Sequence, residues 1–465
     1  MERSRRNHAA AALAILAAAA WIRLPALRTE PWLDEIWSIM FARAAKSVGD
    51  VLFGLHHDNN HPLNTLWLYW TSGRRDWALW RLPSFVSGLL IVGILAWDET
   101  DPAAGLLAAA LAAGSAVMAL YSTEARGYAM MTLCAVACRR LLASRDPLRP
   151  ATAAAFAAVA ALGFFAHPIF LFVLSAAFAW AWFKLPRERR AVGLLVLFGP
   201  AAAAGLAFEL LQRGPLRIGG GALYPFGPVV FRALAQWSGA PDAGPAAFAG
   251  AAALAALCGW ELLRLRRARD AEFAFLAALA VQIAVFVAIL PFRYERYFFV
   301  FLPFALMLAA RALMRLLRRG PGAKASACAL IGLYFLGGAV RIRALDTAGR
   351  GHYLEAVRRM AADTDGPDIY VASDHPFRNP LVLTFYADYL PPGKRMIYVS
   401  AERAQVAPPE WYLRHTFDAD PRTAPVGLEY AGKASYRLAG YYPYAGMSGW
   451  TWLLYRRTSA GRVPE

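Results

Sequence analysis

Charged side chains are scarce in this chain, and acidic ones most of all. Asp, Glu, Lys and Arg make up 17% of its 465 residues, with 32 acidic against 49 basic residues, whereas 58% are hydrophobic. Average globular chains are roughly 45–50% apolar and about 25% charged, so this composition indicates a membrane protein. The formal charge of +17 does not indicate a nucleic-acid partner, because many basic residues stand in short loops between apolar runs.

Cysteine is rare as well. The chain has four, which lie in or beside apolar runs without the spacing of a disulfide framework or a metal site: Cys134, Cys138, Cys258 and Cys328. We expect them to be small buried residues. No nucleotide-binding motif is present either.

Apolar runs, by contrast, recur along the first three quarters of the chain. A membrane span needs roughly 17–25 mostly apolar residues. On that basis we count about eleven spans: 9–27, 77–97, 103–120, 128–142, 151–166, 169–183, 191–211, 246–263, 273–290, 298–317 and 325–340. The sequence therefore predicts a polytopic α-helical membrane protein. The first run also fits a cleaved signal peptide, because it has a basic start and Ala-x-Ala steps.

The loops between these runs alternate in charge. With the N-terminus in the cytoplasm, every second loop is expected to be basic. The loops that fit are Arg139 to Arg149, Lys184 to Arg190, Arg264 to Arg269 and Arg315 to Lys324. The loop at 98–101 is acidic instead, but acidic residues weigh little in this rule. The opposite loops, including the long ones at 28–76 and 212–245, then face the exterior. We expect interfacial helices in the first of these long loops and a lid in the second.

Composition changes again from residue 341 onwards. A helix is predicted at 353–362 and strands at 368–372, 395–400, 435–438 and 450–455, the last two as a possible hairpin. We therefore divide the chain into a membrane domain, 1–340, and a small α/β domain outside the membrane, 341–465. Asp374-His375-Pro376 follows the first strand, and we interpret it as a turn or as a contact with an acceptor.

Every conspicuous polar cluster falls on the predicted exterior side. Asp34-Glu35 lies just after the first span, between Trp32 and Trp37. A carboxylate that is partly desolvated there is a better base, so Asp34 and Glu35 are candidate catalytic residues. The alternative is that they mark a helix N-terminus, where the helix dipole favours acids.

The loop from His56 to Pro62 has enough donors for a divalent metal, since His57 and His61 are four residues apart. It lacks the acidic partner of a zinc-protease helix, and Pro62 starts the next element. We therefore favour a substrate-binding loop, with Asp58 and His61 as its candidate residues, over a metal site or a solvated loop.

Other ionisable residues stand close to the ends of predicted spans. We expect substrate binding by Glu124, Arg126, Tyr128, His167, Arg293, Arg296 and Tyr297. Ionisable groups near hydrocarbon are usually paired or functional, and arginine offers forked donors that suit phosphate. The alternatives are a structural Glu124–Arg126 pair, contacts of Arg293 and Arg296 with lipid headgroups, and a helix-capping role for His167.

An ordered set of short motifs runs through the membrane half: Asp34-Glu35, His61-Pro62-Leu63, Trp80-Arg81-Leu82-Pro83-Ser84, Glu124-Ala125-Arg126-Gly127-Tyr128 and Arg296-Tyr297. Over roughly residues 8–340 this set resembles the polytopic GT-C glycosyltransferases. More narrowly, it resembles the protein mannosyltransferase and aminoarabinose transferase superfamily, with its bacterial RgtA/B/C/D-like members. Two motifs depart from the family pattern. His61-Pro62-Leu63-Asn64 replaces His-Pro-Pro-Leu, and Arg126-Gly127-Tyr128 replaces Arg-Pro-Tyr or Arg-Met-Tyr.

The resemblance implies a GT-C-like fold in a bacterial inner membrane. It also implies transfer of a sugar from a polyprenyl-phosphate carrier to an extracytoplasmic glycan, lipid or protein. Asp34 matches the family's catalytic acid, and Glu35 its neighbour. We expect Asp34 to accept the acceptor's proton with inversion at the sugar, while Arg126, Arg293 and Arg296 stabilise the leaving phosphate. Metal assistance is optional, because the phosphate leaves as a stable anion.

Other functions would use the same residues. A flippase or transporter for a lipid-linked sugar needs charges along a pathway within the spans and often has related halves, and neither is visible in the sequence. A polysaccharide polymerase or ligase would share the exterior site and the lipid phosphate. A structural scaffold leaves the clustered acids and arginines unexplained.

Overall fold

The computed structural model describes residues 2–97, 101–221, 223–417, 424–430 and 432–458. Three residues of the acidic loop, 98–100, lie outside these ranges. The chain forms two compact units. The first comprises Met1–Leu27 and Phe41–Ile342, and the second comprises Arg28–Met40 and Arg343–Glu465. The segment Arg28–Met40 thus packs with the C-terminal unit. The division predicted from the sequence, at residue 340, assigns this segment to the membrane domain instead.

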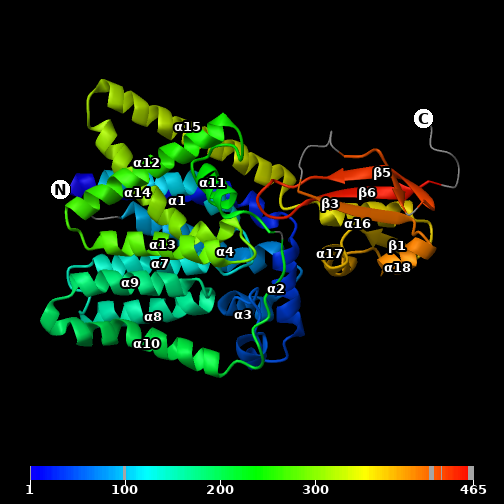
Figure 1. The fold of residues 1–465 in the computed structure, drawn as a ribbon, viewed down its shortest axis with the longest axis horizontal. Coiled ribbons are helices and arrows are strands. Elements are labelled where there is room, and N and C mark those ends of the chain that lie inside the picture. The colour runs from blue at the N-terminus through cyan, green and yellow to red at the C-terminus, as the bar shows by residue number, and fades with distance from the viewer. Residues whose placement is uncertain (1, 98–100, 222, 418–423, 431, 459–465) are drawn as a thin grey trace. The chain divides into compact units, whose positions relative to one another are not determined.

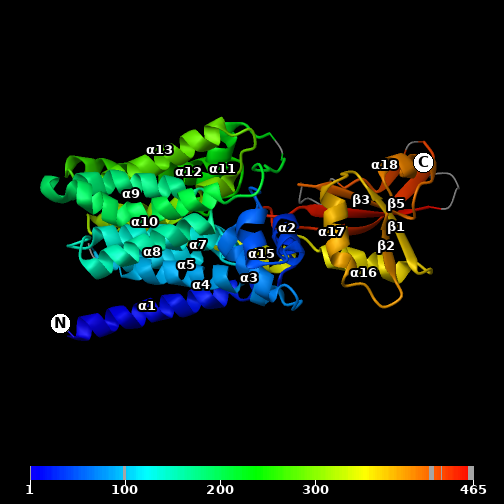
Figure 2. The same cartoon turned by 90° about the horizontal axis from the view of Figure 1, so that it is seen from below.

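The first unit is a bundle of helices (Figures 1 and 2). Its long helices are α1 (Glu2–Arg23), α4 (Trp77–Ala96), α5 (Pro102–Gly114), α7 (Tyr128–Ala143), α8 (Pro150–Ala166), α9 (Phe170–Lys184), α10 (Arg190–Leu210), α12 (Pro245–Arg267), α13 (Glu272–Ile289), α14 (Leu302–Leu317) and α15 (Pro321–Ala348). Each of the eleven predicted runs overlaps one of these helices, but the run 103–120 is divided at Ser115 between α5 and a short helix, α6 (Ala116–Tyr121). In the described ranges, seven helical stretches are long and apolar enough to cross a membrane, and α5, α8 and α9 are shorter apolar helices. The chain is therefore a polytopic α-helical membrane protein.

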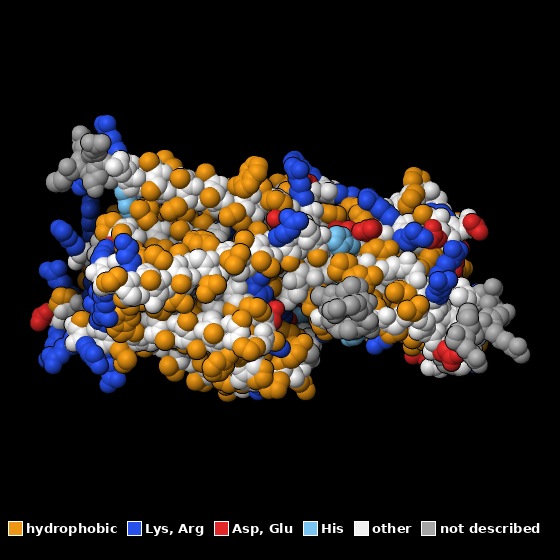
Figure 3. Space-filling view, turned by 90° about the horizontal axis from the view of Figure 1, so that it is seen from above, with side chains coloured by type: hydrophobic (Ala, Val, Ile, Leu, Met, Phe, Trp, Pro, Cys, Tyr) orange, Lys and Arg blue, Asp and Glu red, His pale blue; other side chains and the backbone are white. Residues whose placement is uncertain are grey.

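The surface of this unit suits a bilayer. Large apolar side chains are exposed on its flanks, among them Trp21, Phe183, Leu195 and Phe248. Lys and Arg side chains gather at the end where α1 begins (Figure 3). By the positive-inside rule this end is the predicted cytoplasmic side, and the orientation stays a prediction. The cysteine expectation holds for Cys134 and Cys138 but is wrong for Cys328, which is exposed among the apolar side chains of α15.

Charged groups inside the bundle pair with each other at the basic end. Glu272, the first residue of α13, accepts hydrogen bonds at 2.7 Å from Arg139 Nε on α7 and at 3.1 Å from Arg311 Nη1 on α14. All three side chains are buried. One carboxylate held by two guanidinium groups closes this network and ties three helices together.

The two long loops that are predicted to face the exterior contain short helices. The first has η1 (Pro25–Arg28), α2 (Leu33–Ala44), the π-helical turn η2 (Asp50–Gly54) and α3 (Pro62–Thr71), and the second has α11 (Phe226–Trp237). The remaining short helices of this unit are α6 (Ala116–Tyr121), η3 (Arg187–Arg189) and η4 (Glu295–Phe301). Helix α6 exists because Ser115 ends α5 and caps the next turn, its hydroxyl accepting from Met118 N.

The C-terminal unit is a mixed α/β domain. In its described residues, one sheet has the order β2-β1-β3-β6-β5-β4, with β1 (Asp368–Ser373), β2 (Arg395–Tyr398), β3 (Trp411–Thr416), β4 (Gly427–Tyr430), β5 (Ala434–Tyr442) and β6 (Thr451–Arg457). Strand β1 is parallel to β2 and β3, and the other pairs are antiparallel. The predicted pairing of the last two strands is confirmed as β5–β6. The helices are α16 (Tyr353–Asp363), α17 (Arg378–Ala387) and α18 (Ala401–Val406).

Alternate residues of β6 show how the helices cover this sheet. The Trp452 ring lies 4.8 Å from that of Tyr353 on α16, and its Nε1 donates to Asn379 Oδ1 on α17 at 2.8 Å. Leu453 and Tyr455 instead pack with Ala404 of α18. Because successive strand residues point to opposite faces, α16 and α17 cover one face and α18 covers the other.

Candidate functional site

His61 lies at the centre of a buried polar cluster in the helical unit. It precedes Pro62, whose fixed φ suits the first turn of α3. The Nδ1 atom of His61 accepts a hydrogen bond from Gly127 N at 2.9 Å, so the proton of the neutral ring is on Nε2. Within the described residues, this Nε2 is buried and has no hydrogen-bond partner. The ring therefore offers one donor inside the protein that the fold does not use.

Gly127 allows this contact because it has no side chain. A Cβ atom there would lie 2.0 Å from Ala166 O and 2.9 Å from His61 Cβ. The glycine that departs from the family pattern is thus the residue that lets the end of α8 approach the start of α7.

His167 follows Ala166 at the end of α8 and joins the same cluster. Its ring centroid lies 4.6 Å from that of His61 and 4.7 Å from that of Tyr128. Its Nδ1 accepts from Ile169 N at 3.1 Å, so it too is protonated at Nε2 when neutral. The predicted capping role and the predicted place in the site are therefore combined in one residue.

Arg126 and Arg296 bring positive charge to these two histidines. The Arg126 guanidinium lies 5.1 Å from the centre of the Tyr128 ring, and that of Arg296 lies 4.4 Å from the Tyr294 ring. Burial lowers the pKa of His61 well below its usual value, and His167, Arg126 and Arg296 act in the same direction. Burial and the same two arginines lower the pKa of His167 to about 3. Both imidazoles are therefore neutral donors at physiological pH.

Aromatic packing sets the position of the loop that carries Arg296. The Tyr121 ring lies 5.4 Å from that of Tyr128 and 4.5 Å from that of Phe299, so it joins α6, α7 and η4. Tyr297 is at the edge of the same group, with its ring 5.8 Å from the Arg296 guanidinium. These contacts bring the second arginine beside the first across 170 residues of sequence.

Asp58 lies at the more exposed side of this cluster. Its Oδ1 is 2.8 Å from His57 Nδ1 and accepts from Gly219 N at 3.0 Å. Desolvation alone would raise the pKa of Asp58, but the His57 and Gly219 hydrogen bonds and the charge of Arg126 lower it overall. The loop 212–245 is held here by a second hydrogen bond, since Arg217 N donates to His56 O at 2.9 Å. Whether this segment moves as a lid stays a prediction.

Two predicted substrate-binding residues have structural contacts in the fold. Arg293 donates to Val287 O and Ala288 O at the end of α13, and to Tyr224 O, at 2.9–3.1 Å. Its guanidinium is thus a cap and a loop clamp. Glu124 is buried in the turn before α7, and Arg126 N donates to its carbonyl at 2.8 Å.

The predicted catalytic pair, Asp34 and Glu35, belongs to the C-terminal unit. Both lie in the first turn of α2 and are buried. Glu35 Oε2 lies 3.8 Å from Arg350 Nε, and it accepts from Trp32 N at 3.4 Å. This gives Glu35 a structural contact with a fully buried arginine. The helix-terminus interpretation is correct for their position in α2, and the catalytic role stays a prediction.

Packing on α16 and α17 holds the start of α2 in this unit. Glu30 accepts from Leu354 N at 2.6 Å, Tyr386 OH donates to Pro31 O at 2.7 Å, and Trp37 lies 5.4 Å from the Phe377 ring. Burial raises the pKa of Glu30 to about 7, against its hydrogen bonds to backbone amides.

Several residues that position the site have no assigned role in the sequence interpretation. Asn64 Nδ2 donates to Ala125 O at 2.7 Å, and Ser84 Oγ donates to Arg126 O at 2.9 Å. Both residues occur in the sequence motifs given above, and that position was the only sign in the sequence that they belong to the site. Arg350 gave none, because its partner Glu35 is 315 residues away in sequence. Among the described residues, no three His, Cys, Asp or Glu side chains gather as metal ligands would.

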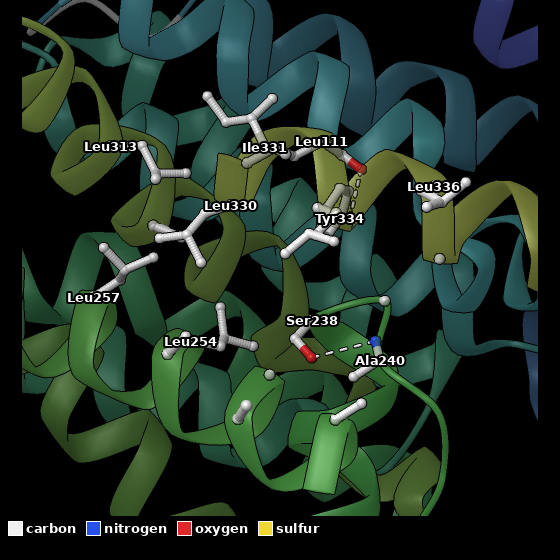
Figure 4. A pocket seen from close by; sticks show the side chains of 18 of the residues that line it. Leu111, Ser238, Ala240, Leu254, Leu257, Leu313, Leu330, Ile331, Tyr334 and Leu336 are labelled. Atoms are coloured by element: carbon white, nitrogen blue, oxygen red, sulfur yellow. Dashed lines mark hydrogen bonds between the residues drawn. The ribbon is translucent and has the colours of Figure 1, made fainter. Parts of the chain in front are cut away.

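A separate apolar cavity of about 390 Å³ lies between α5, α12, α14, α15 and the loop that follows α11 (Figure 4). Its polar groups are engaged within the fold: Tyr334 OH donates to Leu111 O at 2.7 Å, and Ser238 Oγ donates to Ala235 O at 2.8 Å. No charged side chain lines it. The cavity can hold hydrocarbon, but it offers no group for acid–base chemistry.

Solved structures share this architecture. No known family profile matches the chain, and no curated protein sequence does. ArnT from Cupriavidus metallidurans in the apo state is 14% identical and aligns with a TM-score of 0.54 over 95% of this chain and 97% of its own. The same protein bound to undecaprenyl phosphate gives 0.53 over 97% and 99%. The chain has the GT-C fold. The oligosaccharyltransferase AglB from Archaeoglobus fulgidus, in complex with an inhibitory peptide and a dolichol-phosphate, also has it. AglB is 11% identical, with a TM-score of 0.51 over 87% of this chain and 69% of its own.

The GT-C fold covers both units, because the two ArnT alignments extend over nearly the whole chain. The resemblance predicted from the membrane half therefore extends to the C-terminal domain. At this level of identity the match establishes the architecture, and the assignment of individual residues depends on their own geometry.

Proposed function

We propose that this chain is an integral membrane glycosyltransferase. It transfers a sugar from a polyprenyl-phosphate carrier to a glycan, lipid or protein acceptor on the non-cytoplasmic side of a bacterial inner membrane. The observation that carries the proposal is the buried cluster in which Arg126 and Arg296 act on two neutral histidines. The similar structures support it, since ArnT was solved with undecaprenyl phosphate and AglB with a dolichol-phosphate.

The chemistry of the cluster suits a lipid phosphate. Two guanidinium groups supply positive charge and forked donors. The Nε2–H group of the neutral His61 ring adds an uncharged hydrogen-bond donor. In a water-poor setting these groups stabilise developing negative charge more strongly than water does. They therefore favour departure of the phosphate over mere binding of the intact donor.

Asp34 is the proposed base. It accepts the proton of the acceptor hydroxyl as that oxygen forms a bond to the anomeric carbon. The bond from this carbon to the phosphate oxygen breaks on the opposite face, so configuration inverts and polyprenyl phosphate leaves as the anion. Arg126 and Arg296 stabilise that anion, and Asp58 orients the sugar or the acceptor. No step requires a metal ion.

The test uses the full-length protein in nanodiscs with labelled undecaprenyl-phosphate hexoses and pentoses, and membrane extracts as a source of acceptors. Asp34→Asn should lower transfer roughly 10²–10⁴-fold at equal expression, because a general base is lost. Arg126→Gln and Arg296→Gln should each lower it roughly 10²–10³-fold. Arg318→Gln is the matched control. Its side chain is 56% exposed at the basic end of the bundle, so transfer should not change.

Near-wild-type transfer by the Asp34→Asn protein would overturn the role of Asp34. Donor binding without any turnover by the wild-type protein, across all sugars, would instead favour the transporter. Sugar added repeatedly to one growing chain would indicate a polymerase built on the same site.

A further inference from the structure

The sheet of the C-terminal unit has a topological switch point at the end of β1. From β1 the chain passes through α17 to β2 on one side, and from β2 through α18 to β3 on the other. All three strands are parallel. In open sheets of this kind, ligands bind in the crevice at the carboxyl ends of the strands where the connections diverge.

Ionisable side chains gather at this edge. Asp374 and His375 directly follow β1, His415 lies near the end of β3, and Arg378 is the first residue of α17. The rings of His375 and His415 are 5.3 Å apart. These residues come from three elements, and the turn expected at 374–376 is part of their arrangement.

A chain of hydrogen bonds holds the arginine. The Asp374 carboxylate is 3.0 Å from His415 Nδ1 and accepts from His415 N at 3.1 Å and from Asn379 Nδ2 at 3.0 Å. With the proton of His415 on Nδ1, its Nε2 accepts from Arg378 Nη1 at 3.3 Å. The carboxylate thus fixes the tautomer of His415, and the imidazole orients one edge of the guanidinium.

The other edge of Arg378 remains available to a ligand. Among the described residues, its Nε and Nη2 make no hydrogen bond. Aromatic rings support the guanidinium plane, with Phe417 at 5.5 Å and Trp450 at 5.9 Å. His375 Nδ1 accepts from Phe377 N and Arg378 N, each at 3.2 Å, which leaves its Nε2–H as a second donor. Partial burial, Arg378 and His415 keep the pKa of His375 below its usual value, so this tautomer persists at neutral pH.

We propose that this edge is a binding site for an anionic group, a phosphate or a carboxylate, held by Arg378 and His375 between the ends of β1 and β3. A guanidinium edge offers two parallel donors to such a group, and the ring N–H of His375 adds a third. In the proposed reaction the anion belongs to the acceptor, and this clause alone rests on the proposed function. Trp37, one turn after Asp34 on α2, contacts Phe377 beside Arg378. An acceptor anchored here is therefore held by the same unit that carries the proposed base.

The test follows the indole N–H resonance of Trp450 in full-length protein, assigned with Trp450→Phe, during titration with inorganic phosphate or glucuronate. No donor is present, so the result is independent of sugar transfer. The reporter lies at this edge, since its ring is 5.9 Å from the Arg378 guanidinium, and loss of the shift in Arg378→Gln assigns it to this site. We expect saturable shifts, with the dissociation constant raised about tenfold or more by Arg378→Gln. His375→Asn keeps an acceptor for the two backbone amides but removes the ring donor, and it should also weaken binding.

Arg414→Gln is the matched control. It removes the same charge from the residue next to His415, but Arg414 pairs with Leu453 and so points to the opposite face of the sheet. Binding by this variant should stay within about twofold, because surface charge away from the site contributes little. Titration in phosphatidylcholine nanodiscs, with and without phosphatidylglycerol, separates the sources. A lipid headgroup in the site would weaken glucuronate binding in the wild type.

The proposal is overturned if neither anion gives a saturable shift, or if Arg378→Gln binds as the wild type does. An equal loss in Arg414→Gln would also overturn it, since diffuse charge would then explain binding. If Arg378→Gln does not fold, unchanged binding by His375→Asn refutes the proposal. Failure here with normal sugar transfer removes the anion site alone.

Discussion

Gly127→Ala is the substitution for which the structure gives the sharpest expectation. The backbone there has φ −74° and ψ −6°, which alanine adopts without strain. The obstacle is the Cβ atom itself, which would lie 2.0 Å from Ala166 O, whereas such contacts below 3.0 Å essentially do not occur. The chain at Gly127 or at Ala166 must therefore move by about 1 Å, an overpacking that costs about 1–3 kcal/mol.

That movement reaches both imidazoles of the cluster. Gly127 N donates to His61 Nδ1, and Ala166 directly precedes His167. A misplacement of about 1 Å at reacting groups can lower a rate roughly 10²-fold. We thus expect Gly127→Ala to insert in the membrane and to melt at a lower temperature. It should transfer sugar roughly 10²-fold more slowly in the labelled-donor assay.

Gly259→Ala is the control for this prediction. Gly259 lies in α12, and a Cβ built there meets nothing within 4 Å beyond the adjacent residues and backbone of its own helix. Alanine should therefore stabilise that helix by up to about 1 kcal/mol, without a change in transfer. If Gly127→Ala keeps both the wild-type melting temperature and a rate within threefold of wild type, the packing at Ala166 does not position the histidines as argued.

Three further predictions follow from buried charges. Arg350→Met removes the guanidinium beside the buried Glu35 carboxylate, so we expect the C-terminal unit to lose about 3–5 kcal/mol in chemical denaturation. Adding Glu35→Gln should recover part of it, and an additive double mutant would contradict the pairing. Glu272→Gln should lower the melting temperature of the helical unit, because it weakens the hydrogen bonds from Arg139 and Arg311. Donor binding should stay normal, because this network lies at the end of the helical unit opposite the histidine cluster. Since the folded pKa of His167 is about 3, the unfolded chain binds the proton first as pH falls below about 6.5. The stabilisation by neutral His167 should therefore be fully present above about pH 6.5 and be lost as the pH falls towards about 3. The unfolding equilibrium constant should rise by up to about tenfold per pH unit in this range, and the rise should be smaller in His167→Gln.

The helices of the membrane half could be predicted because their signal is local. Each run is apolar over nearly its whole length. The break between α5 and α6 at Ser115 was not predicted, because the run 103–120 is apolar on both sides of it. The sheet was harder to predict. Strands β3 and β4 and helices α17 and α18 were not predicted from the sequence. β3 carries Arg414 and His415 in a six-residue run, and α17 contains Pro380. Short elements with polar interruptions give little periodicity.

The candidate site shows the same limit in another form. The residue types at positions 61, 126, 167 and 296 could be selected from sequence, because ionisable groups near hydrocarbon are unusual. The contacts that each of these side chains makes could not be predicted from the sequence. The packing of Arg28–Met40 with the C-terminal unit depends on partners more than 300 residues away, such as Leu354 and Tyr386. Contacts of this range leave no pattern in a single sequence.

The contrast between Arg293 and Arg296 illustrates the consequence for mechanism. The two stand three residues apart, and the sequence gives them the same role. In the structure, Arg293 donates three hydrogen bonds to backbone carbonyls, each worth about 1.5–3 kcal/mol when the donor is charged. Turning this guanidinium towards a substrate would sacrifice them. Arg296 instead adds its charge to the two histidines. In the proposed mechanism Arg293 therefore acts indirectly: its hydrogen bonds fix the end of α13 and Tyr224, close to the η4 turn that carries Arg296.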